Sequence, residues 1–520
     1  MYGLLPFKPL ALLCAYAPTL ALAYTNPILW NDLADLDVSR VNTTYYYSAS
    51  SMHFSPGAPI LQSSDLVNWE YIGHSVPRLD WGSDYDLTTG RVYRQGVWAS
   101  WLKYRASQDT WYWGGCVDFW ISYVYSAPSV TGEWTRRASI QKCYYDSGLL
   151  IDDDDTMYIS YISDTNIWVA QLSDDGTEEV TSQQVFAPPA DIGYLEGTRP
   201  YKYDGRYYIL ATKPGAGTYM LQADSIFGNY TIKTLVLNVP QEGNKAGSVH
   251  QGSLVDTPEG DWYYMGFIDA YPGGRIPVMA PITWGEDGFP VAELSNGAFA
   301  TTYDDPIPQV PAPSLTGTET FDTLGPQWEW NHNPDTSAYS VGDGLTLNTV
   351  TVTTDLYSAR NTLTTRILGP DSTATIELNY ENMALGDRAG LVLLRDHSGY
   401  VGVQNDGGSF TVAMVTDIDM DDNWDTASNG TVVETADISG GTVWLRLYAD
   451  ITPQGGQAPN IARFSYSTNG STFTSIGEDF TMVTGWEFFM GYRFGIFNYA
   501  TSDLGGSVHV PSFTLDAGGV

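Results

Sequence analysis

Five times in the first half of this chain, a polar turn runs directly into a strand rich in aromatic residues. The five stretches end at tyrosines spaced 46–66 residues apart, namely Tyr46, Tyr112, Tyr158, Tyr208 and Tyr263. Hairpins that recur at this spacing are typical of a β-propeller, in which each repeat forms one blade. The repeat therefore predicts five blades around a central channel.

Four of these five tyrosines are preceded by an acidic residue or a histidine, 11–13 residues earlier in the chain. These four residues are Asp35, Asp146, Glu196 and His250. Equivalent positions in successive blades occupy equivalent places around the channel, so we expect the four side chains to converge there. Paired carboxylates in one pocket are the catalytic groups of a glycosidase.

The second half of the chain is also rich in β-type sequence but lacks the tyrosine hairpin. Short runs of Val, Ile, Thr, Tyr and Trp alternate with Gly, Asp, Asn and Pro turns, and this pattern suits a β-sandwich. Between the halves, 304–313 holds four prolines in ten residues, as expected of a stiff extended linker. We predict an all-β chain with a propeller over 24–303, a linker over 304–317 and a jelly-roll-like sandwich over 318–520.

The N-terminus resembles a secretory signal over 1–23, with one charge at Lys8, an apolar run and a small-residue cleavage site ending at Ala23. The apolar run is too short to span a bilayer. We therefore expect a secreted, extracellular protein. Four sequons are then candidate glycosylation sites, beginning at Asn42, Asn229, Asn429 and Asn469.

Beyond the predicted signal, the chain keeps two cysteines, Cys116 and Cys143. In an oxidising compartment the two can form a disulfide that ties the second repeat to the third. The alternative is a pair of buried free thiols.

The charge of the chain limits its partners. A net charge of −36 argues against nucleic acid or an anionic membrane as a partner. It suits a protein that acts on a neutral polymer, although an acidic surface also serves solubility alone. We expect a monomer.

Glycoside cleavage needs a carboxylic acid that protonates the leaving oxygen and a carboxylate on the other face of the sugar. A neighbouring negative charge raises the pKa of the acid and keeps it protonated. Three carboxylates can therefore divide into base, acid and pKa modulator, but their spacing does not say which is which.

Several motifs in the first half resemble glycoside hydrolase family 43, in matching order and spacing. The matches include Asn26-Pro-Ile-Leu29, Ser64-Asp-Leu-Val-Asn-Trp69, Gly96-Val-Trp-Ala99, Asp146-Ser-Gly-Leu-Leu150, Glu196-Gly-Thr-Arg-Pro200, Val249-His-Gln-Gly252 and Gly274-Arg275. The second half resembles the β-sandwich attached to xylan-active members, through Trp328-Glu-Trp330, Thr362-Leu-Thr364 and Gly386-Asp-Arg-Ala-Gly390.

The resemblance implies a five-bladed propeller that inverts the anomeric centre, with Asp35 as general base, Asp146 as pKa modulator and Glu196 as general acid. It places His250 near the channel centre, where many members hold a calcium ion or a water cluster. It implies no requirement for an organic cofactor, and any calcium would be structural or electrostatic.

The resemblance also places Arg275 and Trp98 beside the sugar, and we expect His53 to line the pocket. The chain departs from the usual family motifs after each carboxylate: Leu36 and Ser147 replace prolines, and the acid is followed by Gly-Thr-Arg rather than Gly-Pro-His. No departure removes a carboxylate, so these differences concern the shape of the pocket.

The predicted activity is exo-acting release of α-L-arabinofuranosyl side chains from arabinoxylan. The sequence around Asp35 and Asp146 resembles that of fungal arabinofuranosidases that remove 1,3-linked arabinose from disubstituted xylose. A β-xylosidase is the alternative, because the sandwich is shared with that activity. Two further classes, a non-catalytic carbohydrate-binding propeller and a structural adhesion module, would not require all three carboxylates.

Overall fold

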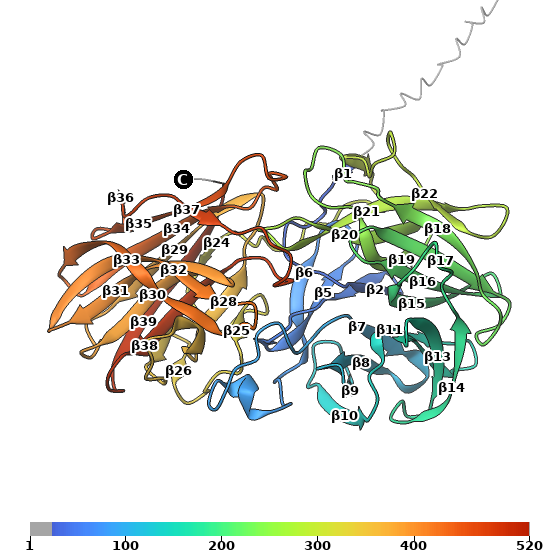
Figure 1. Ribbon diagram of the computed structural model, residues 1–520, viewed down its shortest axis with the longest axis horizontal. Coiled ribbons are helices and arrows are strands. Elements are labelled where there is room, and N and C mark those ends of the chain that lie inside the picture. Colours follow the sequence, from blue (N-terminus) through green and yellow to red (C-terminus); the bar gives the residue numbers. More distant parts are fainter. Residues whose placement is uncertain (1–22, 519–520) are drawn as a thin grey trace, which may run out of the picture.

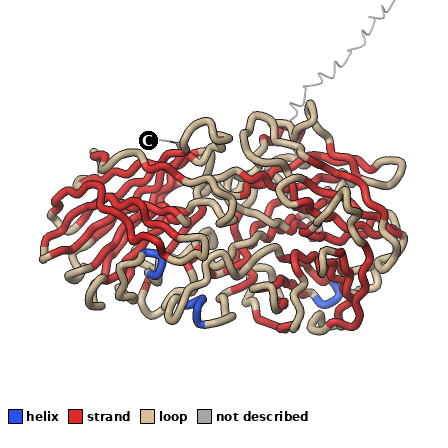
Figure 2. Tube along the Cα trace, in the orientation of Figure 1, coloured by secondary structure: helices blue, strands red, loops and turns tan. Residues whose placement is uncertain are grey.

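The computed structural model describes residues 23–518, and Figure 1 shows two β-rich bodies side by side. The predicted signal segment lies outside the described residues, apart from Ala23. Within the described part, nearly all regular structure is β (Figure 2), and the exceptions are three short 3-10 helices, η1 (Ser83–Asp86), η2 (Ala106–Gln108) and η3 (Leu356–Ser358). No helix among the described residues is both long and apolar enough to cross a membrane.

The first body is a propeller of five antiparallel four-stranded sheets, as predicted. In order from inside to outside, blade 1 is β2 (Asp37–Val41), β3 (Thr44–Ser48), β5 (Gly57–Ser63) and β6 (Glu70–Val76). Blade 2 is β7 (Ser100–Arg105), β8 (Thr110–Val117), β9 (Ile121–Ala127) and β10 (Thr135–Ile140). Blade 3 is β11 (Tyr145–Ile151), β12 (Met157–Ser163), β13 (Asn166–Leu172) and β14 (Glu179–Phe186).

Blades 4 and 5 follow the same plan. Blade 4 is β15 (Glu196–Tyr203), β16 (Arg206–Lys213), β17 (Gly217–Ala223) and β18 (Thr231–Leu237). Blade 5 is β19 (His250–Asp256), β20 (Trp262–Asp269), β21 (Arg275–Trp284) and β22 (Pro290–Ala292). The two ends of the propeller pair through β1 (Ala23–Thr25) and β23 (Thr302–Asp304), which holds the ring closed.

The five repeated tyrosines all lie in the second strand of their blades. The turn before each one contains a residue with a left-handed backbone, at Asn42, Asp109, Asp155, Asp204 and Gly260. Asn, Asp and Gly are the residues that adopt this conformation most readily. The recurring turn chemistry therefore sets the hairpin between the first and second strands of every blade.

The second body is a β-sandwich of two sheets, also as predicted. One sheet contains β24 (Gly317–Glu319), β26 (Tyr339–Ser340), β27 (Leu345–Asn348), β29 (Asp371–Asn379), β34 (Thr442–Asp450), β35 (Asn460–Ser467), β36 (Thr474–Ser475), β37 (Phe480–Met482) and β39 (Ser507–Ala517). The other contains β25 (Glu329–Asn331), β28 (Leu363–Arg366), β30 (Asp387–Leu394), β31 (His397–Asp406), β32 (Ser409–Met420), β33 (Thr426–Ile438) and β38 (Arg493–Ala500). Alternate apolar side chains from both sheets form the core between them.

The two bodies share a sheet. A short propeller strand, β4 (Phe54–Ser55), pairs with β25 at the edge of the second sandwich sheet. Beside it the fully buried Glu329 carboxylate accepts hydrogen bonds from Arg366 at 3.0 Å and Arg493 at 2.6 Å. These two arginines belong to the sandwich themselves. Across the boundary, His74 Nε2 of the propeller lies 3.1 Å from Glu329 Oε1, and Arg366 Nε donates to the Asp32 carbonyl at 2.8 Å. Sandwich loops can therefore contribute to a site on the propeller.

Candidate active site

Three of the four predicted channel residues lie at the starts of inner strands, and Asp35 lies two positions before β2. The three strand residues occupy two adjacent registers rather than one. Glu196 and His250 are the first residues of β15 and β19 and pair with the second strand of each blade. Asp146 lies one position later, inside the irregular stretch of β11 that follows the pair between Tyr145 and Ile162. The assumption that the four positions are equivalent was therefore wrong by one residue.

A left-handed residue near the start of each of these inner strands explains the difference. These residues are Asp35, Asp146, Gly197 and Gln251, with φ between 36° and 57°. Such a residue in a bulge breaks the strict alternation of side chains in a strand. Neighbouring positions can then both direct side chains toward the channel, and the three carboxyl groups come close enough to interact electrostatically.

A buried guanidinium joins the backbones that carry the carboxylates. Arg199 Nη1 donates to the Ser147 carbonyl at 2.7 Å, and Nη2 donates to the Asp35 carbonyl at 2.9 Å. Arg199 itself is 2% exposed and lies on the same strand as Glu196. It therefore fixes the three carboxylate-bearing segments relative to one another, a role that the sequence motif did not indicate.

The two carboxylate oxygens of Asp35 have different surroundings. Its Oδ1 accepts a hydrogen bond from Arg275 Nη1 at 2.8 Å, and both side chains are buried. Its Oδ2 is also buried, and no group among residues 23–518 hydrogen-bonds to it. One oxygen is thus positioned by a cation, and the other can accept a proton from a water molecule.

Glu196 and Asp146 are carboxyl groups whose pKa values are both raised. Burial, together with the negative charge of Asp35, raises the pKa of Glu196 from 4.5 to about 7. Burial, Glu196 and Asp35 raise the pKa of Asp146 well above its usual range. A carboxyl group with a pKa of about 7 stays largely protonated in mildly acidic solution, as a general acid requires.

Tyr145 lies beside this pair and was missed in the sequence. Its hydroxyl lies 3.4 Å from Glu196 Oε2, to which it donates a hydrogen bond. Its position directly before Asp146 was the only available signal.

A cavity of about 380 Å³ opens beside Glu196 and is walled by both bodies. From the propeller it is lined by His250, Phe267, Asp269, Tyr271 and Arg275, among others, and from the sandwich by Trp486 and Phe489. The sandwich also positions Arg275, since Phe489 O accepts a hydrogen bond from Arg275 Nε at 3.0 Å. Residues so distant in sequence could not be assigned to the site from spacing.

Asp32 links the same elements through its carboxylate. Oδ1 accepts from Arg275 N at 2.8 Å, and Oδ2 accepts from Gly491 N at 2.9 Å. Asp32 is buried. It therefore connects the segment that bears Arg275 to the sandwich loop that bears Phe489.

Trp98 and His53 lie in different environments, the first next to the cavity and the second in the buried interior. The Trp98 ring packs at 5.1 Å from Phe489 and 5.9 Å from Phe119, so it lies in the wall next to the cavity. His53 is fully buried against Phe54 and His332, and burial lowers its pKa well below the usual value. A fully buried ring cannot contact a substrate, so the prediction that His53 lines the pocket was wrong.

His250 lies in the cavity wall, but its surroundings do not fit a calcium site built from protein ligands. Its Nδ1 lies 2.9 Å from the Ser248 carbonyl oxygen, its ring packs against Phe267, and its Nε2 lies 3.8 Å from one carboxylate, that of Asp269. Calcium prefers six to eight oxygen ligands. Within residues 23–518, no group of three or more His, Cys, Asp or Glu side chains is arranged to hold a metal.

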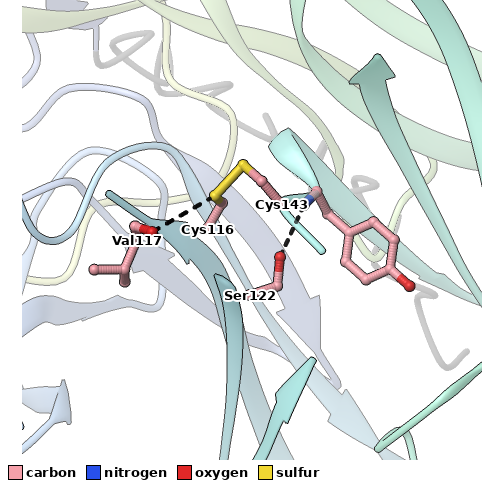
Figure 3. Close-up of a disulfide and its surroundings, with 5 residues drawn as sticks. Cys116, Val117, Ser122 and Cys143 are labelled. Carbon is pink, nitrogen blue, oxygen red and sulfur yellow. Dashed lines mark hydrogen bonds between the residues drawn. A yellow bond between two sulfur atoms is a disulfide. The ribbon is translucent and has the colours of Figure 1, made fainter. Parts of the chain in front are cut away.

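The two cysteines form a disulfide with an S–S distance of 2.05 Å, shown in Figure 3. It joins the end of β8 to the segment that leads into Tyr145 and Asp146. Next to it, the Tyr144 amide donates to Ser122 Oγ at 2.8 Å. All four sequon asparagines are exposed, as attachment of a glycan requires.

Comparison with known proteins assigns both halves of the chain. The family model of glycosyl hydrolases family 43 matches residues 24–290, and that of the beta xylosidase C-terminal concanavalin A-like domain matches residues 318–516.

Among solved structures, one comes from work in which engineering the active site of a GH43 glycoside hydrolase generated an enzyme displaying both endo-xylanase and exo-arabinofuranosidase activity. It is 44% identical, with a TM-score of 0.92 over 95% of this chain and 100% of that chain. A beta-xylosidase of Formosa agariphila is 27% identical over 95% of this chain and 90% of its own length. The non-reducing end alpha-L-arabinofuranosidase BoGH43B of Bacteroides ovatus is 24% identical over 72% of this chain and 74% of its own.

Proposed function

Because this chain belongs to glycosyl hydrolases family 43, we propose that it is an inverting, exo-acting enzyme that releases α-L-arabinofuranosyl side chains from arabinoxylan. The preferred target would be 1,3-linked arabinose on disubstituted xylose. The observation that carries the catalytic part is the convergence of Asp35, Asp146 and Glu196, of which Glu196 lines the cavity and has its pKa raised to about 7.

In this mechanism Asp35 is the general base. Its free Oδ2 accepts a proton from a water molecule, while Arg275 holds Oδ1 and keeps the carboxylate in place. The water oxygen forms a bond to the anomeric carbon as the bond to the leaving oxygen breaks, which inverts the configuration.

Glu196 is the general acid and transfers its proton to the leaving oxygen. Its raised pKa keeps that proton available in mildly acidic solution. Asp146 is the modulator: the mutual repulsion of the three carboxyl groups keeps at least one of them protonated. No step involves a metal or an organic cofactor.

Arabinofuranose is favoured as the released sugar by the 44% identical enzyme, whose engineered form displays exo-arabinofuranosidase activity. The second candidate is a β-xylosidase acting on xylo-oligosaccharides, which is favoured by the name of the Formosa relative. A non-catalytic binding propeller would have no need for an acid with a raised pKa.

We further propose that the protein is secreted after removal of 1–23, is glycosylated at its four exposed sequons and acts as a monomer. Its working units would be a propeller over 24–303 and a sandwich over 318–520, joined by 304–317. The resemblance to fungal enzymes in particular stays a prediction.

The test is release of sugar from arabinoxylan, with products separated by chromatography and anomers followed by proton NMR. We expect free arabinose to appear first as the inverted anomer, and the residual linkages to show loss of 1,3-linked substituents. Xylose as the main product would favour the β-xylosidase. Release of neither sugar, with binding intact, would contradict the hydrolase mechanism.

A further inference from the structure

A strongly exposed tryptophan lies at the tip of the hairpin between β8 and β9. Trp120 is 78% exposed, and its neighbour Phe119 is 55% exposed. Large aromatic side chains bury much apolar area when they find a partner, so two adjacent ones in solvent suggest a ligand surface.

The hairpin tip is held firmly rather than left free. Asp118 and Phe119 both have a left-handed backbone, with φ of 54° and 61°, and the Trp120 amide donates to the Val117 carbonyl at 3.2 Å. The Asp118 carboxylate accepts a hydrogen bond from the Tyr85 hydroxyl at 2.8 Å. The Cys116 disulfide anchors the end of β8 just before the turn.

The tip is continuous with the catalytic site. The Phe119 ring stacks on Tyr145 at 5.8 Å, with an angle of 29° between the ring planes. Tyr145 in turn hydrogen-bonds to Glu196. On the other side Phe119 packs against Trp98, which contacts Phe489 of the sandwich loop. The exposed pair therefore lies at the rim, and one aromatic layer separates it from the acid.

We propose that Trp120 and Phe119 form an aromatic platform that binds a xylopyranose ring of the polysaccharide main chain while a side chain occupies the cavity. The inference rests on the proposed function and names a main-chain binding site for it. The flat apolar face of a pyranose ring suits an indole ring. The acidic protein, with a net charge of −36, would not repel this neutral polymer.

The platform predicts a selective loss on polymeric substrate. In Trp120→Ala, kcat/KM on arabinoxylan should fall about fivefold to tenfold more than kcat/KM on 4-nitrophenyl α-L-arabinofuranoside, the size of one lost aromatic contact. Trp120→Tyr should recover most of the difference. Leu385→Ala, which removes an apolar side chain of 59% exposure in the sandwich, is the matched control and should change neither value. An equal loss on both substrates in Trp120→Ala would overturn the proposal.

A binding experiment separates this inference from the activity. Glu196→Gln and the double variant Glu196→Gln with Trp120→Ala are compared by native gel electrophoresis in gels containing soluble xylan. We expect xylan to retard the single variant more than the double variant, whatever sugar the wild type releases. Equal retardation of the two would contradict the platform. Failure of the wild type to release arabinose would instead contradict the proposed function.

Discussion

Replacing Glu196 with glutamine should make the protein more stable in neutral solution while it destroys the activity. The folded protein raises the pKa of Glu196 from 4.5 to about 7, mainly because the side chain is buried and Asp35 lies near it. The folded state therefore binds the Glu196 proton more tightly than the unfolded state does. Stability from this proton is fully present below pH 4.5 and is lost as the pH rises through about 7.

The size of the effect follows from the pKa of Glu196 in the unfolded state, 4.5, and in the folded state, about 7. Between pH 5 and pH 8 the wild type should lose about 2–3 kcal/mol of unfolding free energy through this one group. Glutamine does not ionise, so Glu196→Gln escapes that loss. The charge of Glu196 also contributes to the raised pKa of Asp146. Removing that charge in Glu196→Gln therefore lowers the pKa of Asp146, which further favours the stability of the variant at high pH.

The assay is guanidinium chloride unfolding of wild type and variant at pH 5 and pH 8, followed by tryptophan fluorescence. We take the difference in unfolding free energy between the two proteins at pH 8 and subtract the same difference at pH 5. This subtraction removes any effect of the amide that does not depend on pH. We expect this double difference to favour the variant by about 2 kcal/mol or more. Arabinose release should fall roughly 10²- to 10⁴-fold in the same variant. A double difference near zero would refute the raised pKa, and with it the argument for Glu196 as the acid.

Three other changes test separate parts of the site. Asp35→Asn should lower kcat on arabinoxylan by roughly 10³-fold, because an amide cannot take a proton from water; a kcat within tenfold of the wild type would exclude Asp35 as the base. Asp32→Asn turns one acceptor oxygen into a donor facing a backbone N–H, so it should cost about 1–3 kcal/mol of stability and lower kcat more than it changes KM; unchanged kcat and melting temperature would show that Asp32 does not position Arg275. Replacing Cys116 and Cys143 together with serine opens a loop with a sequence separation of 27, at a cost of about 3–4 kcal/mol; calorimetry that detects no fall in melting temperature would contradict this.

The sequence alone predicted the architecture because the signals for it are local. In each blade, the turn between the first and second strands has a left-handed residue that is Asn, Asp or Gly, and a strand of alternating apolar residues follows it. Both signals can be read within about ten positions. The three carboxylates could be named for the same reason, since each stands at a regular distance before such a turn. The proline-rich stretch likewise separated two β-rich halves that are a propeller and a sandwich.

Only the tertiary structure decided the surroundings of those carboxylates. The bulges at the starts of inner strands set the acid and the pKa modulator in different registers, and a count of residues along the chain does not reveal a bulge. The sandwich loop supplies Phe489 and Trp486 to a cavity whose other walls lie more than 200 residues away in sequence. His53, which seemed placed for the pocket, is instead covered by the sandwich that pairs with β4.

The physical reason is the range of the forces involved. Backbone conformation depends on a residue and its close neighbours, so turns and strands are visible in the chain itself. Burial, ion pairing and pKa depend on whatever packs around a side chain, as Arg199 shows by bonding to carbonyls more than 50 and more than 160 positions away. The sequence therefore determined which groups could do chemistry, and the packing of two domains decided which of them face a common cavity.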